Sequence, residues 1–190
     1  MRGFDFAYSF GFYEGTLRAL IHLLKYSGMK PLAERLSGLL LRAMPIDVAF
    51  DLVVPMPLHW RRRWKRGFNQ AKLLARHVGL RRGIPVLDAV RRVRATATQA
   101  GLTNSNRRKN VSGAFRVAAR YRRNGALSGK RILLIDDVMT TGATGAACAH
   151  ALKRAGARSV TLLTLARTDR RFVSLDATSK STKTSGENSR

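Results

Sequence analysis

Cysteine and acidic residues are scarce in this sequence of 190 residues. Cys148 is the only cysteine, so one chain can form neither a disulfide nor a cysteine zinc site, and a reducing, cytoplasmic location fits this composition. The four histidines are scattered along the chain, which predicts no tightly bound zinc. No run reaches the ~18 consecutive apolar residues that a membrane-spanning helix needs, so we expect no membrane insertion.

The shortage of acids leaves a large excess of positive charge. Only 11 Asp and Glu residues oppose 36 Lys and Arg residues, which gives a formal net charge of +25. Solubility does not require so much charge, and we therefore expect a polyanionic partner. Nucleic acid and pyrophosphate-bearing metabolites both meet this description. A compositional bias toward arginine is the alternative explanation.

The hydrophobic pattern predicts an N-terminal part over residues 1–48. Aromatic residues alternate with small or polar ones over residues 4–12, which indicates a strand. Apolar residues at helical spacing over 17–24 and 32–40 predict two helices, which Gly28 and Pro45 should end. We expect this strand and a small helical lobe to pack on the core.

Residues 49–172 predict an α/β core with an open, mainly parallel sheet flanked by helices. Short apolar strands are expected at 52–54, 132–135 and 160–165, with helices at 69–78 and 144–155. Segments 85–87 and 114–118 also read as strands, although the sequence leaves the place of 85–87 in the sheet open. The composition of residues 173–190 predicts a disordered tail.

One segment, ILLIDDVMTTGAT at residues 132–144, carries most of the chemical information. Asp136 and Asp137 follow an apolar strand, at the sheet edge where open α/β sheets bind ligands. The Thr/Gly loop that comes next leads into a helix, so backbone N–H groups and hydroxyls can bind a phosphate. Carboxylates beside such a loop suit sugar hydroxyls better than a bare anion. Together they predict a ribose 5′-phosphate site.

Other phosphate motifs fit this segment less well. The sequence has no G-x-x-x-x-G-K-[ST], and Gly142 and Gly145 lack the preceding glycine of the dinucleotide fingerprint. Nucleotide hydrolysis and NAD chemistry therefore lose support. The remaining alternative makes the two acids ordinary turn and cap residues.

The segment at 132–144 resembles the phosphoribosyl-pyrophosphate motif of type I phosphoribosyltransferases. YEGTLRALIHLLKYSGMKPLA at 13–33, DLVVPMPLHWRRRWKRGFNQA at 51–71 and TQAGLTNSNRRKNVSGAF at 98–115 are similar to the ComF family, the competence-associated branch of that fold. Members of that family commonly begin with a cysteine-rich zinc ribbon, which has no counterpart in this sequence. Docking through a ribbon is therefore not carried over.

The resemblance implies that the chain binds phosphoribosyl pyrophosphate with Mg²⁺ and transfers the phosphoribosyl group to a nucleophile. Asp136 and Asp137 would be the catalytic residues, holding the ribose hydroxyls directly or through Mg²⁺. The 5′-phosphate would bind Thr140, Thr141, Gly142, Ala143 and Thr144. The pyrophosphate loop would contain Met56, Pro57, Leu58, His59 and Arg61. A flap over residues 94–109 would close the site with Gln99, Arg107 and Arg108, excluding water.

A basic segment at 60–66 suggests a second, different function. It interleaves cations with aromatic rings, the combination that binds single-stranded DNA: Trp60, Arg61, Arg62, Arg63, Trp64, Lys65 and Arg66. The alternative is a solvated loop that serves pyrophosphate alone. Two hypotheses thus stand: a phosphoribosyltransferase linked to DNA uptake, and a non-enzymatic DNA-binding or ligand-sensing component of the competence machinery. The sequence leaves open whether competence proteins or a second copy bind the chain.

Overall fold

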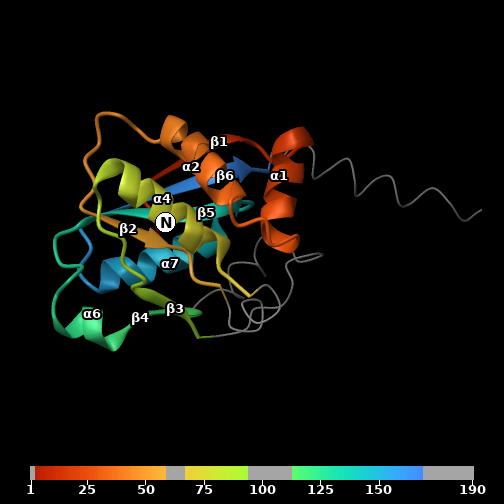
Figure 1. Ribbon diagram of the computed structural model, residues 1–190. Coiled ribbons are helices and arrows are strands. Elements are labelled where there is room, and N and C mark those ends of the chain that lie inside the picture. Colours follow the sequence, from red (N-terminus) through yellow and green to blue (C-terminus); the bar gives the residue numbers. More distant parts are fainter. Residues whose placement is uncertain (1–2, 59–66, 94–112, 169–190) are drawn as a thin grey trace, which may run out of the picture.

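The centre of the computed structural model is a four-stranded parallel sheet (Figure 1). The structure describes residues 3–58, 67–93 and 113–168. Across the sheet the strand order is β1-β6-β5-β2, and all three neighbouring pairs are parallel. The four strands are β1 (Phe6–Phe12), β2 (Leu52–Pro55), β5 (Arg131–Met139) and β6 (Ser159–Arg167).

Helices cover both faces of this sheet. One face packs against α1 (Gly15–Tyr26), α2 (Leu32–Ala43) and α4 (Gln70–Arg82). The other face packs against α7 (Ala143–Arg154) and a small antiparallel sheet of β3 (Val90–Arg92) and β4 (Phe115–Val117), which α6 (Ala119–Arg123) follows. The predicted α/β class, an open parallel sheet flanked by helices, is confirmed.

Strand β5 shows why the sequence could predict this architecture. Its residues Ile132, Leu133, Leu134 and Ile135 are fully buried. Ile132 and Leu134 belong to the core cluster on the α7 side, whereas Leu133 and Ile135 belong to the cluster beneath α1, α2 and α4. Because both faces are covered, the strand reads as a continuous apolar run. Burying each such side chain stabilises the fold by about 1.5–3 kcal/mol.

Two boundaries differ from the sequence-based expectation, and the structure also places residues 85–87, whose position in the sheet the sequence left open. Strand β5 does not end before the acid pair, because it pairs with β6 as far as Met139. Helix α4 continues past residue 78 to Arg82 and ends at Gly83, whose φ of 65° suits a C-terminal cap. Residues 85–87 lie beside β2, through a parallel bridge between Val53 and Val86.

The N-terminal elements belong to the same layers as the rest. The aromatic alternation predicted strand β1, and in the structure this strand pairs with β6 from Phe6 to Phe12. Helices α1 and α2 share one hydrophobic cluster with the central strands. None of the described helices is long and apolar enough to cross a membrane.

Candidate functional site

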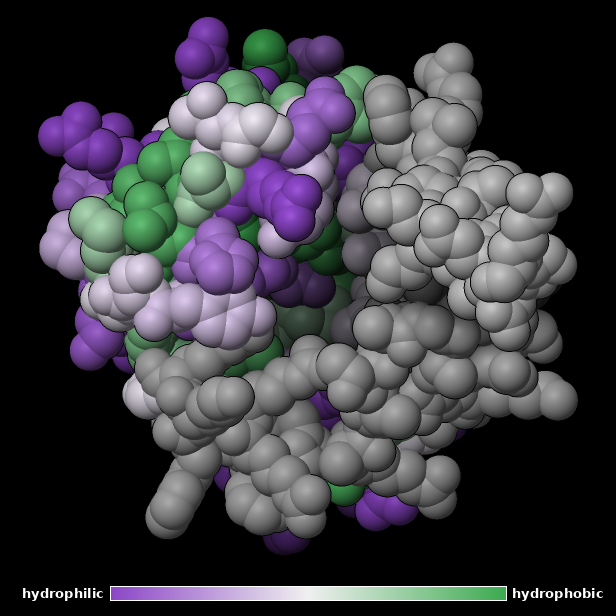
Figure 2. Space-filling model, turned by 90° about the vertical axis from the view of Figure 1, so that its right-hand side faces the viewer, coloured by the Kyte–Doolittle hydropathy of each residue, from purple (hydrophilic) through white to green (hydrophobic). Residues whose placement is uncertain are grey.

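A pocket of about 340 Å³, hereafter the acid pocket, lies where β2 ends beside β5. Figure 2 views this side of the molecule, where hydrophilic side chains border a hollow in the surface. Strand β2 stops at Pro55, opposite Ile135, so β5 continues beyond its neighbour and exposes the residues that follow. The described side chains that shape the pocket include Tyr13, Lys25, Met56, Pro57, Leu58, Gln70, Arg92, Asp136, Asp137, Thr140, Thr144, Thr164 and Thr168.

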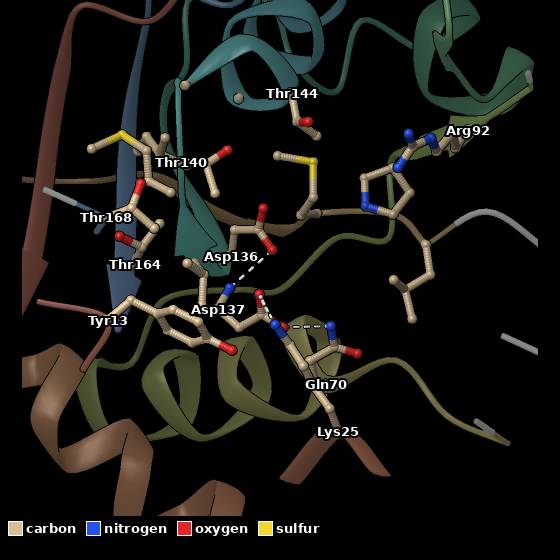
Figure 3. A pocket seen from close by; sticks show the side chains of 18 residues that line it. Tyr13, Lys25, Gln70, Arg92, Asp136, Asp137, Thr140, Thr144, Thr164 and Thr168 are labelled. Atoms are coloured by element: carbon tan, nitrogen blue, oxygen red, sulfur yellow. Dashed lines mark hydrogen bonds and ion pairs between the residues drawn. The ribbon is translucent and has the colours of Figure 1, made fainter. Parts of the chain in front are cut away.

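The two acids of the motif have different surroundings (Figure 3). Successive side chains on a strand point to opposite faces. Asp136 is directed toward the phosphate loop, and its Oδ1 accepts a hydrogen bond of 2.9 Å from the Asp137 backbone N–H. Asp137 is directed toward α1 and α4, where its Oδ1 lies 3.0 Å from Lys25 Nζ and its Oδ2 accepts a 2.5 Å hydrogen bond from Gln70 Nε2.

This arrangement affects the charge of Asp136. Burial disfavours its ionised form and the Asp137 carboxylate repels it, so the pKa of Asp136 rises from 3.8 to about 7. Lys25 and Arg92 partly offset the rise. A carboxyl group with a pKa near 7 can release or bind a proton when a ligand binds. Such perturbed pKa values are common at functional sites.

The phosphate loop lies at one end of the acid pocket. Gly142 has a φ of 76°, a conformation that residues with a Cβ rarely adopt, and it directs the chain into α7. No described side chain caps the N-terminus of α7. The Ala143 N–H donates a 3.4 Å hydrogen bond to Thr141 Oγ1. The N-terminus of a helix favours an anion through its backbone N–H groups and its dipole, and the N-terminus of α7 lies at this end of the pocket.

Close packing beneath the loop fixes its position. A Cβ added to Gly145 would lie 2.7 Å from Leu162 Cδ2 and 3.5 Å from Phe4 Cε1. Glycine thus allows the first turn of α7 to approach β6 closely. Of the five residues assigned to the 5′-phosphate, Thr140, Gly142 and Thr144 line the pocket.

The candidate pyrophosphate loop borders the same pocket. Met56, Pro57 and Leu58 line it. The loop is held by a 2.8 Å hydrogen bond from Met56 N to Ile135 O and by a 3.0 Å bond from Asn69 Nδ2 to Met56 O. Asn69 also caps α4 through the Ala71 N–H. The other two predicted members of this loop, His59 and Arg61, lie outside the described residues.

Two further groups of predicted residues also lie outside the described residues. One is the flap set Gln99, Arg107 and Arg108. The other is the basic segment of Trp60, Arg62, Arg63, Trp64, Lys65 and Arg66. The strands that flank residues 94–112 are described, and they pair antiparallel, with Arg92 opposite Phe115. Arg92 lines the acid pocket from this small sheet.

Sequence reasoning missed several residues of the acid pocket. Lys25 comes from α1 and Gln70 from α4, and Tyr13 lies just before α1. None belongs to the contiguous motif. One signal was available for Lys25, because it lies four residues after the buried Ile21 and thus on the inward face of α1. Within the described residues no three His, Cys, Asp or Glu side chains form a metal-binding group.

A second cavity, hereafter the basic groove, adjoins the acid pocket and has a volume of about 560 Å³. The two cavities share Pro57, Leu58 and Arg92. The lining of the groove includes five cations, the aromatic side chain of Phe68 and a single described acid, Asp88. Lys72 Nζ contacts that acid at 2.7 Å. The cations are Lys72, Arg76, Arg91, Arg92 and Arg120.

The parallel sheet, the acid pair at the edge of β5 and the Thr/Gly loop leading into α7 together define a protein of the phosphoribosyltransferase fold class. Comparison with known proteins agrees with this class. The family model for the phosphoribosyl transferase domain matches residues 65–186. The chain therefore belongs to the phosphoribosyltransferase domain family, in the ComF branch, as its relatives indicate.

These relatives are named for DNA utilization and for competence. DNA utilization protein YhgH of Escherichia coli (strain K12) is 39% identical over 166 residues, which cover 82% of this chain and 69% of that protein. The Salmonella typhi protein of the same name is 36% identical over 166 residues, with the same coverage. Competence protein F of Haemophilus influenzae is 36% identical over 118 residues, 62% of this chain and 50% of that protein.

Solved structures of lower identity are similar in part. The UMP synthase of Leishmania donovani has a TM-score of 0.44 and 19% identity, over 85% of this chain and 27% of that one. Glutamine phosphoribosylpyrophosphate amidotransferase from B. subtilis has a TM-score of 0.46 and 21% identity, over 68% of this chain and 25% of that one. This chain thus spans about a quarter of each of those proteins.

Proposed function

We propose that the chain binds phosphoribosyl pyrophosphate with Mg²⁺ in the acid pocket and transfers the phosphoribosyl group. The observation that carries this proposal is the order of groups along the pocket. Thr140 and Thr144 lie at one end, the Asp136 carboxyl lies in the middle, and Lys25 and Gln70 lie beyond it (Figure 3). A 5′-phosphate, ribose hydroxyls and a diphosphate follow one another in the same order in this ligand.

Each part of the pocket has a chemical task in this proposal. The N–H groups of α7 and the threonine hydroxyls would hold the 5′-phosphate. The Asp136 carboxylate would accept hydrogen bonds from the ribose hydroxyls, and ligand binding would favour its ionised form. The loop of Met56, Pro57 and Leu58 would border the leaving diphosphate. Holding the reacting centre in place and stabilising its charge supplies most of the rate in such a transfer.

The donor set of the pocket suits Mg²⁺. Asp136 offers a carboxylate, and the buried Oε1 of Gln70 has no hydrogen-bond partner among the described residues. In proteins Mg²⁺ takes oxygen ligands, commonly one or two carboxylates completed by substrate phosphates and water. Asp136 would therefore hold the ion, which when bound would neutralise charge on the diphosphate, whereas both oxygens of Asp137 already contact Lys25 and Gln70.

Isothermal titration calorimetry and thermal melting with the Mg²⁺ complex of phosphoribosyl pyrophosphate test this proposal. We expect the ligand to raise the melting temperature, because it binds the folded state. Asp136→Asn and Asp137→Asn should each weaken binding by about 1.5–3 kcal/mol, the contribution of a hydrogen bond to a charged group. Asp51→Asn, which lies outside the pocket, is the control. A melting temperature that does not change when the ligand is added would contradict the assignment of this site.

A second candidate function is binding of single-stranded DNA, and the basic groove supports it. Its cations outnumber its one described acid, and Phe68 offers an aromatic surface. The relatives named for DNA utilization and competence point the same way. In this reading the acid pocket senses a ligand while the groove holds the strand, and no turnover is required.

Fluorescence anisotropy with oligothymidylate at several salt concentrations tests the groove. Log affinity should fall linearly with log salt, by roughly 0.7 for each phosphate neutralised. Arg76→Ala with Arg120→Ala should flatten this slope by up to about 1.4. The control pair Arg35→Ala with Arg42→Ala removes the same charge from α2, away from the groove. Equal effects of the two pairs would mean generic polycation behaviour.

A further inference from the structure

Lys25 is the cation of the acid pocket that the phosphoribosyltransferase motif does not contain. It lies on α1, outside the matched residues 65–186, yet its side chain lines the pocket. The side chain is only 14% exposed, and its Nζ lies 3.0 Å from Asp137 Oδ1. Burying a lysine ammonium in this way costs desolvation free energy unless opposite charges and hydrogen-bond acceptors compensate it.

The neighbours of Lys25 fix its position and leave part of its bonding capacity free. Asp137 is held from its other side by Gln70 Nε2. The ammonium also lies 6.0 Å from the centroid of the Tyr13 ring. An ammonium group has three N–H donors. Asp137 is the one acceptor recorded for Lys25 among the described residues, so two donors remain for a ligand in the pocket.

The charge balance of the pocket indicates what that ligand carries near Lys25. Among the described residues the pocket has two cations, Lys25 and Arg92, and two acids, Asp136 and Asp137. Its phosphate loop offers N–H groups at the opposite end from Lys25 (Figure 3). A ligand whose 5′-phosphate binds this loop and whose hydroxyls meet Asp136 extends its next anionic group toward Lys25.

We propose that Lys25 binds the diphosphate of the ligand, and that Asp137 and Gln70 are positioning residues that hold the lysine in place. The proposal rests on the phosphoribosyl-pyrophosphate function argued above and adds a residue to it. It assigns the second acid of the motif a task different from that of the first. The alternative is that Lys25 merely neutralises Asp137 and never touches the ligand.

Two ligands that differ only in the diphosphate separate these readings. Calorimetry would compare the Mg²⁺ complex of phosphoribosyl pyrophosphate with ribose 5-phosphate. Lys25→Met should weaken the first by about 10- to 100-fold, the effect of losing one charge-assisted hydrogen bond, and change the second by less than about threefold. Lys25→Arg should retain part of the preference. Lys153→Met is the control. It removes an ion pair outside the pocket, in which Lys153 Nζ lies 2.6 Å from Asp5 Oδ1.

Lys25→Met leaves the Asp137 carboxylate buried without its cation, so a second variant is needed in case the first does not fold. Lys25→Met with Asp137→Asn removes both charges and keeps an oxygen for Gln70 Nε2. This double variant should also lose the preference for the diphosphate ligand. Equal losses for both ligands, or no loss for either, would overturn the assignment of Lys25. Wild-type protein that binds neither ligand would instead overturn the proposed function and this inference with it.

Discussion

Replacing Asp136 by asparagine removes a carboxyl group that the fold prefers to keep neutral. Burial and the neighbouring Asp137 raise its pKa from 3.8 to about 7. Between these values the folded protein holds a proton that the unfolded chain has released, so stability falls as the pH rises. One pKa unit corresponds to about 1.4 kcal/mol. From pH 5 to pH 7 the wild type should therefore lose up to about 3 kcal/mol through this group.

Asp136→Asn should not show this loss. Its side-chain oxygen can still accept the hydrogen bond from the Asp137 N–H, so the change in charge is the main perturbation. Urea denaturation of both proteins at pH 5, 6, 7 and 8 gives the difference in unfolding free energy at each pH. That difference should grow in favour of the variant up to pH 7 and then level off, because above the folded pKa both states are ionised.

Asp51→Asn provides a control whose effect on the unfolding free energy should not depend on pH. Arg131 donates hydrogen bonds to Asp51 through its side chain and its backbone, and these lower the pKa of the carboxyl group. Asp51 is therefore ionised in both the folded and the unfolded state between pH 5 and pH 8. Its replacement should destabilise the protein equally across this range. A pH-independent difference for Asp136→Asn as well would refute the raised pKa and the charge coupling inferred for the acid pair.

Two other predictions concern packing and metal content. Gly145→Ala should destabilise the fold by about 1–3 kcal/mol in urea, because its Cβ would lie 2.7 Å from Leu162 Cδ2. Gly38→Ala, a helical glycine with no atom within 4 Å of an added Cβ, should stabilise it by about 0.5–1 kcal/mol; the reverse order would contradict the packing argument. The purified chain should contain no stoichiometric zinc, and elemental analysis that finds one zinc ion per chain would contradict this prediction.

The parts of the site that the sequence predicted are contiguous in it. The apolar run before Asp136, the acid pair and the Thr/Gly loop occupy neighbouring positions, so their order alone indicated a strand, an edge and a helix start. The same holds for the parallel β5-α7-β6 unit. Strand β3 and helix α6 were missed because three and five residues, respectively, are too short to show a period.

The residues that the sequence did not predict enter the site through tertiary packing. Lys25, Gln70 and Arg92 come from three separate elements, and only the folded sheet brings them together. Lys25 and Gln70 lie in the segments 13–33 and 51–71 that resemble the ComF family, but their local patterns did not indicate a role in the site. Strand length was also misjudged at β5, because the pairing of Val138 and Met139 with β6 depends on a partner more than 25 residues away.

Adjacency in the motif does not give the two acids a shared environment. The alternation of a strand directs Asp136 toward the phosphate loop and Asp137 toward the helices on the other face. Asp137 is buried, and its charge is balanced by Lys25 of α1. A buried charge that loses its partner costs about 3–5 kcal/mol. The matched segment of residues 65–186 does not contain this cation, which helix α1 contributes to the candidate site.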